Sequence, residues 1–304
     1  MRLIILAGLL WLAGPAQSQD YPLLPNHDIT AEPLGASSAA AEAEPAAGDD
    51  GRSAGLFGFQ RQDIDTYSIV SVARGLSTHK PMYLMPITYS EDIAGLNTEV
   101  VFQISAKQRL FARNLYFGYT QRSYWQLFDE DRSRPFRETN YNPEVFYRWT
   151  PDPARYKHWG ADIGVEHESN GKDLPDSRSW NRLYLAPFQA KGRHLFYAKL
   201  WYRLPEDRKK DANDPKGDDN PDIEDFYGYT EFHFQRQFFG KHLGHLMARG
   251  NPATGKGAFS LTYSLPSPDG YAFYALSLWH GYGESLIDYN RQVTRIGIGV
   301  MLSR

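Results

Sequence analysis

Apolar and polar residues alternate along much of the chain. Between positions 159 and 169 the odd positions carry Trp, Ala, Ile, Val, His and Ser, whereas the even positions carry Gly, Asp and Glu. Successive side chains of a β-strand point to opposite faces, so this run predicts a strand with one apolar face. The run 195–204 behaves in the same way, because Phe196 and Leu200 share one face and Lys199 lies on the other.

Comparable runs recur over most of the sequence. They lie at 67–75, 83–89, 98–106, 110–120, 143–150, 181–189, 226–238, 242–249, 258–264, 272–280 and 295–302. Short alternating segments separated by turn residues are typical of antiparallel hairpins, and we expect about twelve strands. Two strongly polar breaks interrupt the runs, at 129–135 and at 205–221. The second lacks the ligand spacing of an EF-hand calcium loop, so we predict a solvated loop there.

The N-terminal region differs from the rest in composition. An arginine at position 2, an apolar stretch over residues 3–13 and a small-residue pattern at 16–18 predict a signal peptide over residues 1–18. Much of residues 19–56 is rich in Ala, Glu, Pro, Ser and Gly, which predicts a disordered arm. The folded domain is then expected to span residues 57–304.

The composition restricts how such an exported chain can be stabilised. It has no cysteine, and beyond the signal peptide no stretch approaches the ~20 apolar residues of a transmembrane helix. Without disulfides, an exported protein needs a large core or a closed sheet. Aromatic residues make up 14% of the chain, and strands and membrane interfaces both favour them. These features predict an all-β fold: a transmembrane antiparallel β-barrel of about twelve strands.

His167 and Ser169 end the apolar face of the first run, and that face points to lipid if the protein is a membrane barrel. A hairpin centred near Leu174 would place Asn181 opposite His167, with Cβ atoms roughly 5 Å apart. Asn181 shares its face with Leu183 and therefore also points to the apolar side. The three polar residues could form one cluster on the lipid-facing wall.

This cluster has the residue types of a nucleophile–histidine triad. Ser169 would attack a carbonyl, His167 would take and return its proton, and Asn181 would orient the imidazole. The Gly171 amide lies close enough in sequence to stabilise the oxyanion. Ser177 and nearby carbonyls offer oxygen ligands of the kind that calcium accepts. The pattern Gly-x-Ser-x-Gly of soluble α/β-hydrolases is absent around the serine.

Four stretches carry a resemblance to a known family. They are His167-Glu-Ser-Asn-Gly171 followed by Ser177-Arg-Ser-Trp-Asn-Arg-Leu-Tyr184, then Tyr119-Thr-Gln-Arg-Ser-Tyr-Trp-Gln126, Pro135-Phe-Arg-Glu-Thr-Asn-Tyr141 and Gly281-Tyr-Gly-Glu-Ser-Leu-Ile-Asp-Tyr-Asn290. With these motifs in place, the sequence from Tyr83 to Leu302 resembles outer membrane phospholipase A of Gram-negative bacteria.

The resemblance implies a barrel of the bacterial outer membrane with its triad on the outer wall. Active members of the family are calcium-dependent homodimers that hydrolyse acyl esters of membrane phospholipids, with phospholipase A1, A2 and lysophospholipase activities. Carried over by position, Ser169 is the nucleophile, His167 the general base and acid, Asn181 the residue that orients it, and Gly171 the source of the oxyanion amide.

The resemblance also implies a calcium site and a dimer interface. The ligands would be the Ser177 hydroxyl, the Lys172 carbonyl and Ser133 of the partner subunit, and Gln121 would lie in the interface. Family members often carry arginine in place of Lys172, but a carbonyl ligand does not depend on the side chain.

Two other classes of function fit parts of the sequence. Charged residues predicted to point inward (Asp162, Glu166, Lys199 and Arg203) could line a channel, although opposite charges in a narrow barrel would pair instead. A soluble exported β-protein, such as a sugar-binding module, is disfavoured by the predicted outward apolar faces. The net charge of −3 and the lack of a dominant basic tract argue against a nucleic-acid partner.

Overall fold

The computed structural model describes residues 76–93, 97–111, 114–151, 158–211, 214 and 216–304. All of the described residues belong to the unit Asp50–Arg304. The predicted signal peptide, the arm over 19–56 and the run 67–75 lie outside the described residues.

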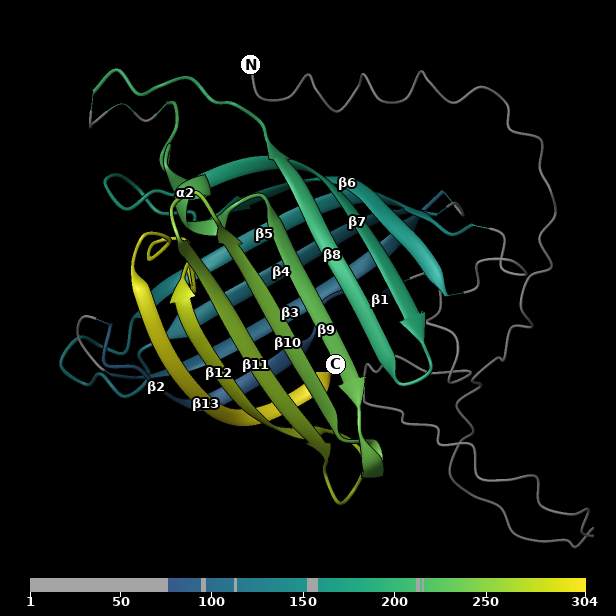
Figure 1. Ribbon diagram of the computed structural model, residues 1–304. Coiled ribbons are helices and arrows are strands. Elements are labelled where there is room, and N and C mark those ends of the chain that lie inside the picture. Colours follow the sequence, from purple (N-terminus) through teal and green to yellow (C-terminus); the bar gives the residue numbers. More distant parts are fainter. Residues whose placement is uncertain (1–75, 94–96, 112–113, 152–157, 212–213, 215) are drawn as a thin grey trace, which may run out of the picture. The chain divides into compact units, whose positions relative to one another are not determined.

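The described part is almost entirely antiparallel β-sheet (Figure 1). Its strands are β1 (Leu76–Thr78), β2 (Met82–Tyr89), β3 (Thr98–Leu110), β4 (Leu115–Trp125), β5 (Phe136–Trp149), β6 (Trp159–Ser169), β7 (Ser179–Lys191), β8 (His194–Arg203), β9 (Thr230–Gln237), β10 (Leu243–Asn251), β11 (Lys256–Pro266), β12 (Phe273–Tyr282) and β13 (Gln292–Ser303). The helices are α2 (Ile223–Tyr227) and the 3-10 turn η3 (Phe239–Lys241), and neither is long enough to cross a membrane.

The sheet closes on itself. From β3 to β13 each strand pairs with the next, and β13 pairs with β2. Both β1 and β2 pair with β3, one with each half of it, so they share one place in the wall. The result is a closed twelve-stranded antiparallel barrel, which confirms the predicted fold class.

Two of the predicted runs cross the boundary of an element, and the run 143–150 begins well inside β5. The run 110–120 straddles the turn between β3 and β4, where Phe111 has a φ of 54° without a Gly or Pro to signal it. The run 226–238 starts inside α2, which ends at Gly228 with a φ of 68°. At Phe111 and at α2 the predicted run continued across a change of backbone direction.

The outward faces of the strands are apolar. On β6 and β7 Ile163, Leu183 and Leu185 are exposed, and their sequence neighbours Asp162, Arg182 and Tyr184 are buried inside. A barrel in lipid needs this arrangement, because its outer surface meets hydrocarbon whereas its interior can hold polar groups.

Inside the barrel the charged residues pair with one another. Glu166 on β6 contacts both Lys199 (2.7 Å) and Arg182 (3.0 Å). Asp162 pairs with Arg148 at 2.7 Å, and Arg203 pairs with a carboxylate of the β8–β9 connection. Charges removed from water are costly unless they are paired, so these contacts line the lumen with compensated groups. This pairing favours a closed barrel over an open channel.

One end of the barrel is plugged. The β8–β9 connection carries α2, whose Ile223, Phe226 and Tyr227 pack with Trp180, Trp201 and Leu286 in one buried aromatic cluster. Because neighbouring strands are antiparallel, the turn between β6 and β7 lies at this same end. The hairpin with the predicted triad therefore lies at the end of the barrel that α2 covers.

Candidate active site

The predicted contact between His167 on β6 and Asn181 on β7 is present in the structure. His167 and Asn181 are direct cross-strand partners, and His167 Nδ1 lies 2.9 Å from Asn181 Oδ1. Both side chains are half-buried on the outward face, in line with the exposed Ile163 and Leu183. An amide oxygen accepts from a protonated Nδ1, which leaves Nε2 as the basic nitrogen.

Ser169 follows His167 by two residues and lies on the same outward face. Its cross-strand partners are Tyr141 on β5 and Ser179 on β7. Within the described residues the structure shows no hydrogen bond between the Ser169 hydroxyl and His167. Such contacts are often long in enzymes without substrate, and they tighten when the complex forms.

Pro143 interrupts the strand next to the histidine. It lies between the paired positions Tyr141–Ser169 and Glu144–Glu166 and has no N–H to donate. The side chain of Asn142 donates instead to the His167 carbonyl at 2.9 Å. This contact holds the backbone of the histidine where the ladder is broken.

A carboxylate that the sequence patterns did not single out completes this cluster. Asn181 Nδ2 donates to Glu206 Oε1 at 2.9 Å, from the connection that follows β8. In the connection 205–221, which we predicted to be a solvated loop, Glu206 is half-buried against Asn181 whereas its neighbour Asp207 is exposed. The sequence patterns did not reveal Glu206, because a contact between a long loop and a distant strand does not affect the local alternation of apolar and polar residues.

The turn after β6 is organised by Asn170. Its Oδ1 accepts from the backbone N–H of Lys172 (3.3 Å) and of Arg178 (2.9 Å), and its Nδ2 donates to the Asp176 carbonyl at 2.8 Å. The side chain is buried, so these bonds tie both ends of the turn together in a protected place. The predicted oxyanion residue, Gly171, lies inside this turn.

Gly171 has a left-handed backbone with a φ of 65°. A Cβ at this position would lie 3.2 Å from the ring of Tyr141, tighter than most packing contacts. The backbone therefore favours glycine here, and a larger residue would have to displace the neighbouring ring.

The two residues predicted as calcium ligands within one chain lie in the same turn. The Ser177 hydroxyl donates to Asp219 Oδ2 at 2.8 Å, and Asp219 Oδ1 lies 2.5 Å from Lys209 Nζ. The Lys172 ammonium contacts β5 instead, through Glu138 Oε2 at 3.3 Å. The side chain of Lys172 thus anchors the turn, and the role predicted for its carbonyl is independent of it.

Ser133, predicted as the calcium ligand from a partner subunit, lies in a different connection from Ser177. It is exposed in the β4–β5 connection and has a φ of 58°. That connection is stabilised by Arg132, whose guanidinium bonds Asp129 at 2.5 Å. Among the described residues there is no group of three or more His, Cys, Asp or Glu side chains suited to a metal.

Gln121 lies on the outward face of β4, in register with the exposed residues Ile104 and Tyr141. It accepts from the Tyr119 hydroxyl and donates to Ser123 Oγ, both at 3.2 Å. A row of hydrogen-bonded polar side chains thus crosses an otherwise apolar wall.

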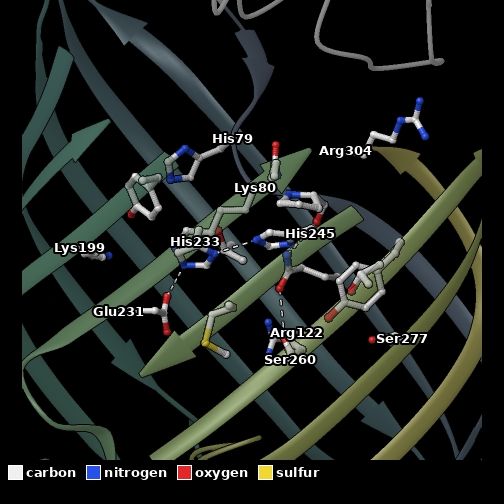
Figure 2. Close-up of a pocket in the computed structure, with 18 of the residues that line it drawn as sticks. His79, Lys80, Arg122, Lys199, Glu231, His233, His245, Ser260, Ser277 and Arg304 are labelled. Carbon is white, nitrogen blue, oxygen red and sulfur yellow. Dashed lines mark hydrogen bonds and ion pairs between the residues drawn. The ribbon is translucent and has the colours of Figure 1, made fainter. Parts of the chain in front are cut away.

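The barrel interior holds a second histidine cluster and a cavity of about 490 Å³. Figure 2 shows His233 and His245 facing each other across β9 and β10, with Glu231 beside them. His233 Nδ1 lies 2.9 Å from His245 Nε2, and His233 Nε2 lies 2.8 Å from Glu231 Oε1. These side chains point into the lumen, away from the lipid-facing wall that carries His167.

One protein family matches most of the chain, including the residues of this site. A model of the phospholipase A1 family matches residues 66–302. The chain belongs to the phospholipase A1 family. It is 36% identical over 261 residues to a putative phospholipase A1 of Neisseria meningitidis, covering 75% of this chain and 65% of the relative. It is 39% identical over 218 residues to phospholipase A1 of Escherichia coli, covering 67% of this chain and 70% of the relative.

Solved structures of the family share the barrel. Outer membrane phospholipase A from Escherichia coli superposes with a TM-score of 0.67 at 33% identity, covering 76% of this chain and 93% of that one. The Salmonella typhi outer membrane phospholipase dimer with bound calcium gives 0.67 at 32% identity, over the same shares. Family and fold together make this chain an outer-membrane β-barrel of a phospholipase family.

Proposed function

We propose that the protein hydrolyses acyl ester bonds of membrane phospholipids with a Ser169–His167–Asn181 triad on its lipid-facing wall. The observation that carries this proposal is the 2.9 Å bond between His167 and Asn181 on an outward face, beside a serine. A triad on this wall meets the acyl chains and ester groups of membrane lipid without drawing them into the barrel. Phospholipase A1, A2 and lysophospholipase reactions all use this ester chemistry.

The reaction proceeds in two halves. Ser169 Oγ attacks the ester carbonyl while His167 Nε2 takes the hydroxyl proton, and the tetrahedral oxyanion then collapses as His167 protonates the departing lysophospholipid oxygen. Water attacks the acyl-serine next, giving its proton to His167, and the fatty acid leaves as Ser169 regains that proton. Asn181 holds the imidazole throughout and stabilises its charged form.

The Gly171 amide is the proposed oxyanion donor. Its left-handed backbone and the absence of a side chain allow a substrate oxygen to approach the N–H. Asn170 fixes the turn on either side, so the amide is held in place before the substrate arrives.

Calcium is the proposed cofactor. The Ser177 hydroxyl contacts the Asp219 carboxylate, and the Lys172 carbonyl belongs to the same turn as Ser177. Calcium prefers such oxygen ligands. A bound calcium ion would supply positive charge for the developing oxyanion. The exposed Ser133 of the partner subunit is the proposed ligand from a second copy.

A homodimer would also account for the polar row around Gln121. Polar side chains facing hydrocarbon are costly, and a second barrel placed against this face would shield them. Activation by dimerisation would follow, because the interface would supply the calcium ligand from the partner and a lipid cleft between two walls.

One assay tests the proposed function. Detergent-purified protein is mixed with phospholipid micelles, with calcium or with a chelator, and released fatty acid is measured. We expect calcium-dependent release by the native protein and loss of at least a thousandfold in Ser169→Ala. Calcium-dependent release that survives this substitution would contradict the assignment of Ser169.

A further inference from the structure

An asparagine orients a histidine only if the correct end of its amide faces the ring. The carbonyl oxygen accepts from Nδ1–H, whereas the amide nitrogen would donate and select the opposite tautomer. In that opposite tautomer the proton sits on Nε2, which then cannot act as a base toward Ser169. The function of Asn181 therefore depends on whatever fixes its amide.

Glu206 is the group in position to do so. An ionised carboxylate only accepts hydrogen bonds, so the end of the Asn181 amide that faces Glu206 must be the nitrogen. The oxygen then faces His167 Nδ1. The bonds of 2.9 Å on the two sides of the amide define a continuous chain from Glu206 to the imidazole.

Glu206 is itself held on both sides. The N–H of Leu204 donates to the Asn181 carbonyl at 2.8 Å, which attaches the end of β8 to the same residue of β7. After Glu206, the Asp207 carbonyl accepts from the N–H of Asp218 at 2.8 Å, which ties the two arms of the loop together. These contacts place the carboxylate more firmly than an exposed acidic side chain would be placed.

We propose that Glu206 is a positioning residue of the triad: its carboxylate fixes the Asn181 amide and thereby the productive tautomer of His167. This role rests on the proposed function and deepens it. Glu206 acts through Asn181 rather than on the substrate, and its negative charge also favours the imidazolium that forms when Ser169 reacts.

A second substitution separates this role from ordinary loop stabilisation. In Asn181→Asp the new carboxylate would face Glu206 at hydrogen-bond distance, and two like charges so close cannot both ionise without a large cost. Glu206→Gln would then supply an N–H donor to that carboxylate. Glu206→Gln should therefore lower activity when residue 181 is Asn and raise activity when residue 181 is Asp.

The experiment measures kcat for fatty-acid release with calcium, using the full-length protein in detergent. Glu206→Gln should lower kcat roughly tenfold, whereas Glu206→Asp should recover part of the loss. In the Asn181→Asp background, Glu206→Gln should raise kcat severalfold. Asp207→Asn, which removes one negative charge from an exposed neighbour in the same loop, is the matched control and should resemble the native protein.

Heat-modifiable migration on gels checks that every variant forms the barrel. If Glu206→Gln behaves like Asp207→Asn, or lowers kcat equally in both backgrounds, the positioning role is overturned while the triad can still stand. If Ser169→Ala and His167→Ala retain activity in the same assay, the proposed function itself is wrong.

Discussion

Two histidine clusters lie on opposite faces of the same barrel wall. On the outside, the described contacts give the His167 imidazole one hydrogen bond, to Asn181, and a serine lies two residues further along its strand. On the inside, both ring nitrogens of His233 are engaged, one by His245 and one by Glu231. The residue type is the same, but the described contacts occupy one ring nitrogen of His167 and both ring nitrogens of His233.

The comparison shows why the strand face decides the role. Inward side chains of β9 and β10 lie among paired charges such as Arg249, which contacts Glu231 at 3.1 Å. Such pairing satisfies buried groups and stabilises the barrel. The outward position of His167 gives its remaining nitrogen access to lipid, where an ester group can reach it.

The largest difference is expected between two single substitutions, His167→Ala and His245→Ala. His167→Ala should lower kcat for fatty-acid release at least a thousandfold, because the general base is lost. His245→Ala should keep kcat close to the native value, since the inner cluster takes no part in the chemistry. Equal losses in the two variants, with both barrels folded, would remove the distinction between the clusters.

A smaller effect is expected at the proposed calcium ligand. Ser177→Ala should raise the calcium concentration needed for half-maximal activity roughly tenfold, with recovery at high calcium. Titration calorimetry of the same variant should show the weakened binding without any substrate. Ser267→Ala, in a turn at the opposite end of the barrel, serves as the control. An unchanged calcium requirement in Ser177→Ala would exclude this hydroxyl as a ligand.

The smallest effect on catalysis is expected in the inner cluster. Glu231→Ala should reduce the free energy of unfolding by about 3 kcal/mol, because Arg249 and His233 lose a buried partner. The kcat per folded molecule should not change. Urea unfolding in detergent measures the first quantity, and Glu231→Gln, which keeps a hydrogen-bonding group, should lose less. A loss of kcat without a loss of stability would contradict a purely structural role.

Much of the fold could be predicted because a barrel strand has two environments. Lipid outside and packed polar groups inside impose a period of two, and the predicted run 159–169 coincides with β6. The turn at Phe111 and helix α2 were not predictable in this way. The Phe111 turn has no Gly or Pro, and the last residues of α2, Phe226 and Tyr227, are of types that strands favour.

In the candidate site, only the residues that strand pairing brings together could be predicted from the sequence. His167 and Asn181 meet because the hairpin turn sets the register of β6 and β7, and that register can be counted from the sequence. Glu206 and Asp219 reach the same hairpin from a long connection. Where such a loop lies depends on tertiary contacts, including those of α2, and not on its own residue pattern.

Covalent labelling of the nucleophile tests the central claim most directly. The full-length protein is incubated with calcium and a long-chain alkyl sulfonyl fluoride, which reacts with activated serines, and the adduct is located by mass spectrometry. We predict one adduct, on Ser169, that is lost in His167→Ala and retained in His245→Ala. An adduct on another serine, or labelling of Ser169 that does not need His167, would contradict the assignment of the outer cluster as the active site.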